Sequence, residues 1–294
     1  MIRVSSRLEL HDSLTRLKAP NARVALVPTM GYLHEGHASL IRLARQQADV
    51  VVVSIFVNPK QFGPSEDLDR YPRDLERDQA LCLEEGVDLL YTPTPDDIYP
   101  AGFRTTVSVA GLTEPLCGAS RPGHFAGVTT VVARLFGLVR PDLAVFGQKD
   151  FQQWRVLAQM TEDLALPVEI VRAPIVREAD GLALSSRNTY LSPDDRLAAR
   201  ALSRALAQAM TTYLAGERDA ERLLEAARTE LAGLDVEYLE LRDVDSLAPV
   251  ATLDGPAVMA LAVKIGKTRL IDNAVLAPDS PDRGLARLLE GAAL

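Results

Sequence analysis

The sequence DVVVVSIFV at residues 49–57 constrains the fold of this 294-residue chain more than any other stretch. It is almost continuous in valine and isoleucine, which favour β-strands. A strand that is apolar on both sides is typical of the centre of a parallel sheet. Because parallel strands are joined by crossover helices, we expect a sheet that is covered by helices on both faces.

Strands and helices alternate through the first two thirds of the chain. Short apolar runs at residues 24–27, 87–91 and 142–146 are typical of further buried strands. Apolar residues recur at helical spacing over residues 38–44, 75–85, 127–139 and 151–164. This alternation predicts an α/β fold with a doubly wound parallel sheet, which binds its ligands beyond the carboxyl ends of the strands.

The pattern changes after residue 176, which predicts a domain boundary. Polar, turn-forming residues follow at 177–181, and Ser192 with Pro193 is typical of a helix start. Helical patterns then extend to about residue 214 and over 220–232, before β-like runs at 236–241, 257–263 and 270–276. We therefore expect a first domain at 1–176 and a smaller α+β domain at 177–294, and the length suits two domains.

The composition narrows the classes of function. Hydrophobic residues make up 47% of the chain and charged residues 24%, as in soluble globular proteins. With a net charge of −8 and no basic run, we expect no nucleic-acid partner and no membrane surface. Residues 1–7 lack the apolar core that is typical of a signal peptide, and about 20 apolar residues nowhere run together, so we expect neither a signal peptide nor a membrane-spanning helix. Cys82 and Cys117 suit packing in a reducing compartment, so a cytoplasmic protein is expected.

The sequence PTMGYLHEGH at residues 28–37 joins a predicted strand to a predicted helix. Such junctions commonly bind phosphate, because a helix N-terminus presents backbone N–H groups that have no partner within the helix. Its glycines permit close backbone approach, and His34 and His37 would lie on the same side of one helical turn. Ordinary surface histidines or a zinc site are the alternatives. Zinc needs about three or four ligands and only Glu35 is near, so phosphate is favoured.

Polar residues also follow two other predicted strands, and we expect these three strand ends to share one crevice. The run at 49–57 leads into NPKQFGP at 58–64, and the run at 142–146 leads into GQKD at 147–150. Lys149 suits contact with a phosphate as a point charge. Gln61 and Gln153 can both donate and accept, which suits a substrate with hydroxyl or carboxylate groups. Taken singly, each is more often an ordinary surface residue.

Two further loops carry candidate groups. SSRN at residues 185–188 offers two hydroxyls and a guanidinium, which together suit a phosphate clamp. RPGHF at residues 121–125 is a second glycine-containing loop before a helix, in which His124 could equally cap or pack. In isolation SSRN is more often a plain turn.

Several common catalytic motifs are missing from the sequence. There is no nucleophile elbow, no Walker sequence and no GxGxxG fingerprint, which weakens the hydrolase, P-loop kinase and dehydrogenase hypotheses. The remaining groups are His, Lys, Arg, Ser and Gln, without an obvious protein nucleophile. Such a set suits nucleotidyl transfer, in which an oxygen of the substrate attacks phosphorus and a divalent metal sits on the phosphates.

Five segments together resemble the pantoate–β-alanine ligase family. They are PTMGYLHEGH at 28–37, SIFVNPKQFGPSEDLDRYPRD at 54–74, RPGHFAGVTTVV at 121–132, FGQKDFQQ at 146–153 and GLALSSRN at 181–188. The segments span most of residues 24–190 in the order of the family, whereas the last third matches only in general character. Leu184 stands where the family often has methionine, which is a conservative change.

The resemblance implies a Rossmann-like doubly wound sheet of the HIGH-type nucleotidyltransferase superfamily, with the smaller domain closing over ATP. It implies that the carboxylate of pantoate attacks the α-phosphate of ATP, which gives pantoyl adenylate and pyrophosphate. The amine of β-alanine then displaces AMP to form pantothenate. Mg²⁺ is expected to be held mainly by the ATP phosphates, with no dedicated protein ligand. A homodimer is the family expectation.

The resemblance also implies residue roles. His37 is implied as a proton donor, and His34, Lys149 and Arg187 as further catalytic residues. Gln61 and Gln153 are implied to bind pantoate, Gln61 also lying beside the β-alanine site. The implied ATP contacts are Met30, Gly31, Tyr32, Leu33, His34, Glu35, Gly36, His37, Gly147, Gln148, Lys149, Asp150, Val176, Leu184, Ser185, Ser186 and Arg187.

Three other functions remain to be weighed against this one. A cytidylyl- or adenylyltransferase would use the same histidine pair without β-alanine. A nucleotide-binding regulatory protein would bind without turnover, although the groups at three strand ends argue for chemistry. A zinc hydrolase that uses His34 and His37 is the third alternative.

Overall fold

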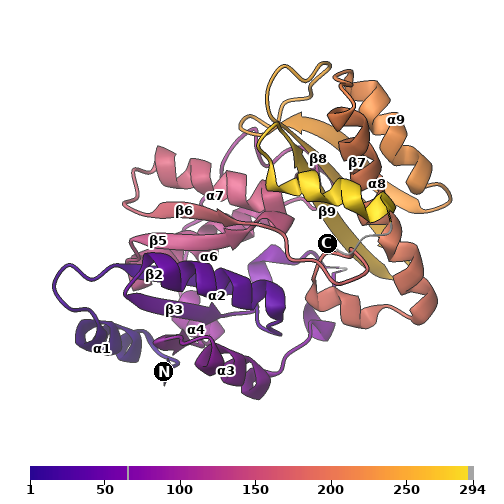
Figure 1. Cartoon of the computed structure of the whole chain (residues 1–294). Coiled ribbons are helices and arrows are strands. Elements are labelled where there is room, and N and C mark those ends of the chain that lie inside the picture. The colour runs from indigo at the N-terminus through magenta and orange to yellow at the C-terminus, as the bar shows by residue number, and fades with distance from the viewer. Residues whose placement is uncertain (65, 291–294) are drawn as a thin grey trace. The chain divides into compact units, whose positions relative to one another are not determined.

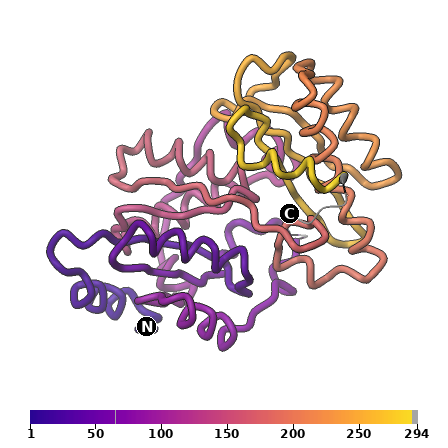
Figure 2. The backbone as a smooth tube through the Cα atoms, viewed as in Figure 1, coloured from indigo at the N-terminus to yellow at the C-terminus, as the bar shows by residue number. Residues whose placement is uncertain are grey.

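The computed structural model describes residues 1–64 and 66–290, which form two compact units (Figure 1). The first unit comprises Met1–Thr113, Arg121–Gln148 and Gln152–Ala173. The second comprises Glu114–Ser120, Lys149–Phe151 and Pro174–Leu294, of which residues 291–294 lie outside the described part. The chain can be followed along the tube of Figure 2. The short segments 114–120 and 149–151 belong to the second unit, and from residue 174 onward the chain stays in that unit.

The first unit contains a six-stranded sheet in the order β1-β4-β3-β2-β5-β6, and every neighbouring pair is parallel. The strands are β1 (Ile2–Val4), β2 (Val24–Thr29), β3 (Val50–Ile55), β4 (Leu89–Tyr91), β5 (Leu143–Gly147) and β6 (Glu169–Ala173). The predicted doubly wound parallel sheet is thereby confirmed. From β2 the chain leads to β3 on one side, and β5 lies on the other, which places the topological switch point at β2.

Helices cover both faces of this sheet, as the apolar run at 49–57 predicts. On one face Val51 and Val53 pack with Leu40 and Ile41 of α2 (Glu35–Gln47). Val52 alternates with them, is fully buried and points to the opposite face. Figure 1 shows α2 in front of the sheet and α6 (His124–Val139) behind it. The other helices of this unit are α1 (Arg7–Leu17), α3 (Leu75–Glu84), α4 (Pro95–Ile98) and α7 (Phe151–Asp163), whose first residue belongs to the second unit.

The second unit contains an antiparallel sheet in the order β7-β8-β9. Its elements are the short helix α5 (Cys117–Ser120), α8 (Pro193–Leu214), α9 (Ala220–Glu230), β7 (Asp235–Asp243), β8 (Ala257–Ile265), β9 (Thr268–Leu276) and a final 3₁₀ segment, Pro281–Glu290. Leucines of α8 such as Leu202 and Leu206 pack against Leu261 and Val263 of β8. The Ser192 hydroxyl accepts a hydrogen bond from the Asp195 N–H at 3.1 Å, which is the predicted helix cap.

Among the described helices and strands, the sequence did not predict β1, β6, α1 and the short helices α4 and α5. β1 has only three residues, and β6 is an edge strand of half-exposed residues that lacks an apolar run. α1 buries only Leu10 and Ser13, so its periodicity is weak. Its signal was the capping box, in which Ser6 and Glu9 pair reciprocally across the first turn. In the described residues no helix is both long enough and apolar enough to cross a bilayer.

Candidate active site

The loop between β2 and α2 carries the two histidines, and its backbone is left-handed at two successive residues. Gly31 has φ of 83° and Tyr32 has φ of 52°. A Cβ atom at Gly31 would lie 3.0 Å from both the Asp78 carboxylate and the Ile55 side chain. Glycine is therefore required at residue 31 for conformation and for space.

Asp78 of α3 holds this loop in place. Its Oδ2 accepts a hydrogen bond from the Tyr32 N–H at 2.8 Å, and its Oδ1 accepts one from the Leu33 N–H at 2.6 Å. The residue is 1% exposed. Burial raises the pKa of the Asp78 carboxyl, and the two amide bonds only partly offset that effect. Asp78 was not among the site residues predicted from the sequence; its signal was an acidic residue four positions before Cys82 on the buried face of the predicted helix.

His34 and His37 cap the start of α2. The Nδ1 atom of His34 accepts a hydrogen bond from the Gly36 N–H at 3.2 Å, and that of His37 accepts one from the His34 N–H at 3.3 Å. The ring centroids lie 4.1 Å apart, which confirms that both rings share one side of the turn. Because each Nδ1 accepts, the neutral rings carry their protons on Nε2. Each Nε2–H is then a donor at the N-terminal end of a helix.

The Nδ1 contacts bear on the zinc alternative. An Nδ1 atom that accepts a backbone hydrogen bond has its lone pair engaged, which suits a helix cap better than metal ligation at that atom. Within residues 1–64 and 66–290 there is no group of three or more His, Cys, Asp or Glu residues that could hold a metal ion.

The carboxyl ends of three strands share one edge of the sheet. β3, β2 and β5 are consecutive and parallel, so the segments that follow Ile55, Thr29 and Gly147 leave the sheet side by side. The shared edge of the three strand ends is therefore confirmed for these segments of the first unit, and the shared crevice stays a prediction. Gly147 and the buried Gln148 belong to this edge.

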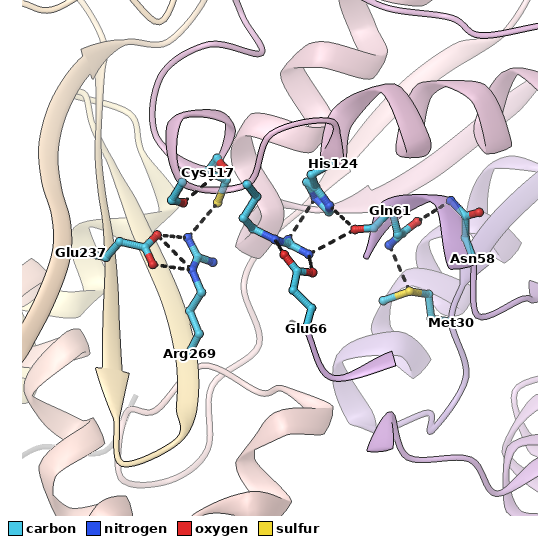
Figure 3. Close-up of polar contacts among 10 residues, drawn as sticks. Met30, Asn58, Gln61, Glu66, Cys117, His124, Glu237 and Arg269 are labelled. Atoms are coloured by element: carbon cyan, nitrogen blue, oxygen red, sulfur yellow. Dashed lines mark hydrogen bonds and ion pairs between the residues drawn. The ribbon is translucent and has the colours of Figure 1, made fainter. Parts of the chain in front are cut away.

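Gln61 lies at this edge, and its side-chain amide is held from two sides (Figure 3). The Asn58 Nδ2 atom donates to Gln61 Oε1 at 3.0 Å, and Gln61 Nε2 donates to the Met30 sulfur at 3.1 Å. Asn58 itself is anchored, since its Nδ2 also donates to the Gly127 carbonyl at 3.1 Å. The amide of Gln61 therefore has a defined orientation beside the loop that carries the histidines.

The loop at 121–125 holds the backbone of Gln61. His124 Nδ1 lies 2.8 Å from the Gln61 carbonyl oxygen, which can only accept, so this ring carries its proton on Nδ1. Arg121 Nη2 donates to the same oxygen at 3.3 Å. Arg121 also forms a bidentate pair with Glu66, with Nε and Nη2 at 2.8 and 2.5 Å from its carboxylate oxygens. His124, whose role the sequence left open, is thus part of the Gln61 site (Figure 3).

Helix α6 approaches the Gln61 turn at backbone distance. A Cβ atom at Gly127 would lie 2.2 Å from the Lys60 carbonyl oxygen and 2.7 Å from the Gln61 N. Any side chain at this position would displace the turn. Gly127 therefore permits the close approach in which Asn58 binds the Gly127 carbonyl and His124 binds the Gln61 carbonyl.

In the second unit, Lys149 and Asp150 lie in a 3₁₀ turn that follows β5. The Asn273 Nδ2 atom of β9 donates to the Lys149 carbonyl oxygen at 3.0 Å. Gln153, in the first turns of α7, belongs to the first unit and is half-buried.

The segment from Val176 to Leu184 forms a hairpin in the second unit. The Leu184 N–H donates to the Val176 carbonyl at 3.0 Å, and the Glu178 N–H donates to the Leu182 carbonyl at 2.8 Å. The hairpin leads into a 3₁₀ segment, Ser186–Tyr190, which is capped by the Ser185 hydroxyl accepting from the Arg187 N–H at 3.2 Å. Ser186 is buried, whereas Leu184, Ser185 and Arg187 are half-buried.

Comparisons with known proteins show one family. A family model described as Pantoate-beta-alanine ligase matches residues 3–275. A pantothenate synthetase of Trichlorobacter lovleyi is 56% identical over 276 residues, which cover 93% of this chain and 97% of that protein. One from Moorella thermoacetica is 57% identical over 256 residues, or 86% of this chain and 90% of that protein.

Solved structures agree with these matches. A pantothenate synthetase from Thermus thermophilus matches with a TM-score of 0.90 and 48% identity, over 95% of this chain and 100% of that one. A pantoate-beta-alanine ligase from Francisella tularensis, complexed with beta-gamma ATP and beta-alanine, matches with a TM-score of 0.75 and 34% identity. That match covers 93% of this chain and 97% of the other.

Proposed function

The chain belongs to the pantoate–β-alanine ligase family, and we propose that it condenses pantoate with β-alanine in an ATP-dependent reaction that yields pantothenate, AMP and pyrophosphate. The observation that carries this function is the family match over residues 3–275, together with relatives that are 52% to 57% identical. The related ligase complexed with beta-gamma ATP and beta-alanine supports these two small molecules as substrates.

The proposed route passes through pantoyl adenylate. A carboxylate oxygen of pantoate attacks the α-phosphorus of ATP, and the bond from that phosphorus to the bridging oxygen of pyrophosphate breaks. The amine nitrogen of β-alanine then attacks the acyl carbon, loses a proton, and AMP leaves. An acyl adenylate is exposed to hydrolysis, so a site that excludes water favours this route.

In the first unit, the loop from Met30 to His37 is proposed to contact ATP. The Nε2–H donors of His34 and His37, beside the positive end of the α2 dipole, suit the negative charge that develops on the phosphates. HEGH at 34–37 is proposed to act as a HIGH-type motif. Gln61 is proposed to bind pantoate through the amide that Asn58 and Met30 orient, with Gln153 as a second contact.

In the second unit, Lys149 is proposed to contact a phosphate as a point charge. Ser185, Ser186 and Arg187 are proposed to donate hydrogen bonds to the triphosphate. Proposed further ATP contacts in the chain are Gly147, Gln148, Asp150, Val176 and Leu184. Mg²⁺ is proposed to be held mainly by the ATP phosphates, where it would neutralise charge, and we assign no protein ligand to it.

The test is pantoate-dependent exchange of pyrophosphate into ATP in the absence of β-alanine. We expect exchange with pantoate alone and pantothenate only when β-alanine is added. His37→Ala should lower the exchange rate far more than it weakens pantoate binding, because His37 is assigned to the phosphates. His11→Ala, at an exposed histidine of α1, is the matched control and should leave exchange unchanged.

Other outcomes would support the rival functions. Exchange that needs no pantoate, or that responds to another alcohol or phosphate, would indicate a different nucleotidyltransferase. Nucleotide binding without exchange would indicate a regulatory protein. We also propose that the protein is a cytoplasmic homodimer, which is the family expectation. Light scattering of the purified protein can test the number of subunits.

A further inference from the structure

Two adjacent polar residues, Asp272 and Asn273, interrupt the apolar strand β9. Each is 2% exposed. Burying such groups is unfavourable unless they form hydrogen bonds, so their partners are informative. Successive side chains of a strand point to opposite faces, and the two residues accordingly bind two different segments of the second unit.

Asp272 fixes the base of the hairpin at 176–184. Its Oδ2 and Oδ1 atoms accept hydrogen bonds from Arg177 Nη1 and Nη2 at 2.7 and 3.0 Å. The side chain of Arg177 is 7% exposed and that of Asp272 is 1% exposed, so this is a buried bidentate ion pair. Arg177 Nη1 also donates to the Gly181 carbonyl at 3.1 Å, which ties the turn of the hairpin to the same carboxylate.

The segment that follows the hairpin is also hydrogen-bonded to it. Asn188 Nδ2 donates to Glu178 Oε1 at 2.8 Å and to the Ala183 carbonyl at 3.0 Å. Arg196 of α8 binds the other Glu178 oxygen at 2.7 Å and Asp180 at 2.9 Å. Ser185, Ser186 and Arg187 therefore lie between the hairpin and Asn188, whose side chain is hydrogen-bonded back to the hairpin.

Asn273 fixes the other candidate phosphate-binding segment. Its amide donates to the Lys149 carbonyl at 3.0 Å, and its own N–H donates to Asp272 Oδ1 at 2.8 Å. The backbone of Lys149 and the hairpin of Arg177 are therefore joined through two consecutive residues of one strand. The charges that are proposed to contact the triphosphate come from both of these segments.

We propose that Asp272 and Asn273 are positioning residues for adenylation, which hold Lys149 and the hairpin that leads to Arg187 as one rigid set. This inference rests on the proposed function, because it takes Lys149 and Arg187 as triphosphate contacts. Neither Asp272 nor Asn273 is assigned a contact with ATP. Their effect comes from geometry, since a displacement of about 1 Å of a binding group lowers a rate by about 100-fold.

The test uses Asn273→Ala, because Asp272 variants would leave the buried Arg177 charge without its partner and endanger folding. We expect the Kd for ATP, measured by calorimetry, and the KM for ATP in the exchange assay to rise roughly tenfold. A rise of this size corresponds to a displacement of the lysine by less than about 1 Å. The KM for pantoate should stay within about twofold. In a Lys149→Ala background, Asn273→Ala should cause no further loss, because it acts through that lysine.

Leu270→Ala is the matched control, since it creates a cavity in the same strand but leaves both polar residues intact. It should lower the melting temperature while the KM for ATP stays within about twofold of the wild type. Three results would overturn the proposal. They are an unchanged Kd for ATP in Asn273→Ala, additive losses in the Lys149→Ala background, or an equal rise in KM for Leu270→Ala. If the wild type shows no pantoate-dependent exchange, the proposed function fails, and the Kd for ATP still decides the role of Asn273.

Discussion

Asp78 shows how a single buried carboxylate shapes the histidine loop. The left-handed backbone at Gly31 and Tyr32 turns two N–H groups toward the carboxylate of Asp78. Its raised pKa shows that desolvation outweighs these two hydrogen bonds, so the charge is unfavourable for folding. The charge of Asp78 is costly to bury, yet the carboxylate orders a loop that carries two candidate catalytic histidines, and this role best explains why the residue is there.

Asp78→Asn should therefore separate stability from activity. The amide removes the desolvation of the charge, so the free energy of unfolding at pH 7 should not fall by more than about 1 kcal/mol. It can accept only one of the two N–H groups, so the loop should shift and the exchange rate should fall at least about tenfold. Urea unfolding and exchange assays measure the two effects.

Asp74→Asn is the control for Asp78→Asn. Asp74 is an exposed N-cap of the same helix, and asparagine caps equally well. The control should keep both stability and exchange. Full exchange activity in Asp78→Asn would show that the position of the loop does not depend on this carboxylate.

Between elements, the Arg121–Glu66 pair joins the segment after the Gln61 turn to the start of α6. Burial by itself would raise the pKa of the Glu66 carboxyl, but the hydrogen bonds and charge of Arg121 outweigh burial and lower it. A lowered pKa in the folded state stabilises the protein above the ordinary glutamate pKa. That contribution is lost as the pH falls through the lowered value.

Glu66→Gln should accordingly reduce the free energy of unfolding at pH 7 and weaken its pH dependence in acid. The difference from the wild type should shrink as the pH falls from about 5 toward 3, because the wild-type glutamate then becomes protonated too. Urea unfolding at several pH values measures this. The exposed Glu76, changed to Gln, serves as the control. A difference that stays constant down to pH 3 would contradict the ion-pair explanation.

At the scale of the whole molecule, the chain passes between the two units five times. The short segment that contains Cys117 belongs to the second unit, where its sulfur lies 3.2 Å from the Tyr238 hydroxyl. The same sulfur lies 3.5 Å from Arg269 Nη2 (Figure 3). Arg269 in turn binds Glu237 at 2.6 Å. If the first unit unfolded alone, segments 114–120 and 149–151 would have to stay in place while their flanking chain lost structure.

We therefore expect the two units to unfold in one cooperative transition. Leu26→Ala in the core of the first unit and Leu261→Ala in the core of the second should each lower the midpoint temperature of the same calorimetric transition. Each truncation of a buried leucine lowers the free energy of unfolding by about 2–5 kcal/mol. The exposed Leu197, changed to Ala, is the control and should leave the transition in place. Two separate transitions, each moved by only one of the core variants, would contradict this expectation.

The sequence alone determined the α/β class, the parallel sheet and the family, because these depend on short-range signals. Apolar runs, helical spacing and the order of motifs from 28–37 to 181–188 are visible without any contact between distant residues. Only the tertiary structure decided that Asp78 holds the histidine loop, that Arg121 and His124 hold Gln61, and that Asn273 binds Lys149. Those partners are 45 to 124 positions apart in the chain. A buried polar side chain has no periodic signature, and its partner is chosen by the packing that brings distant segments together.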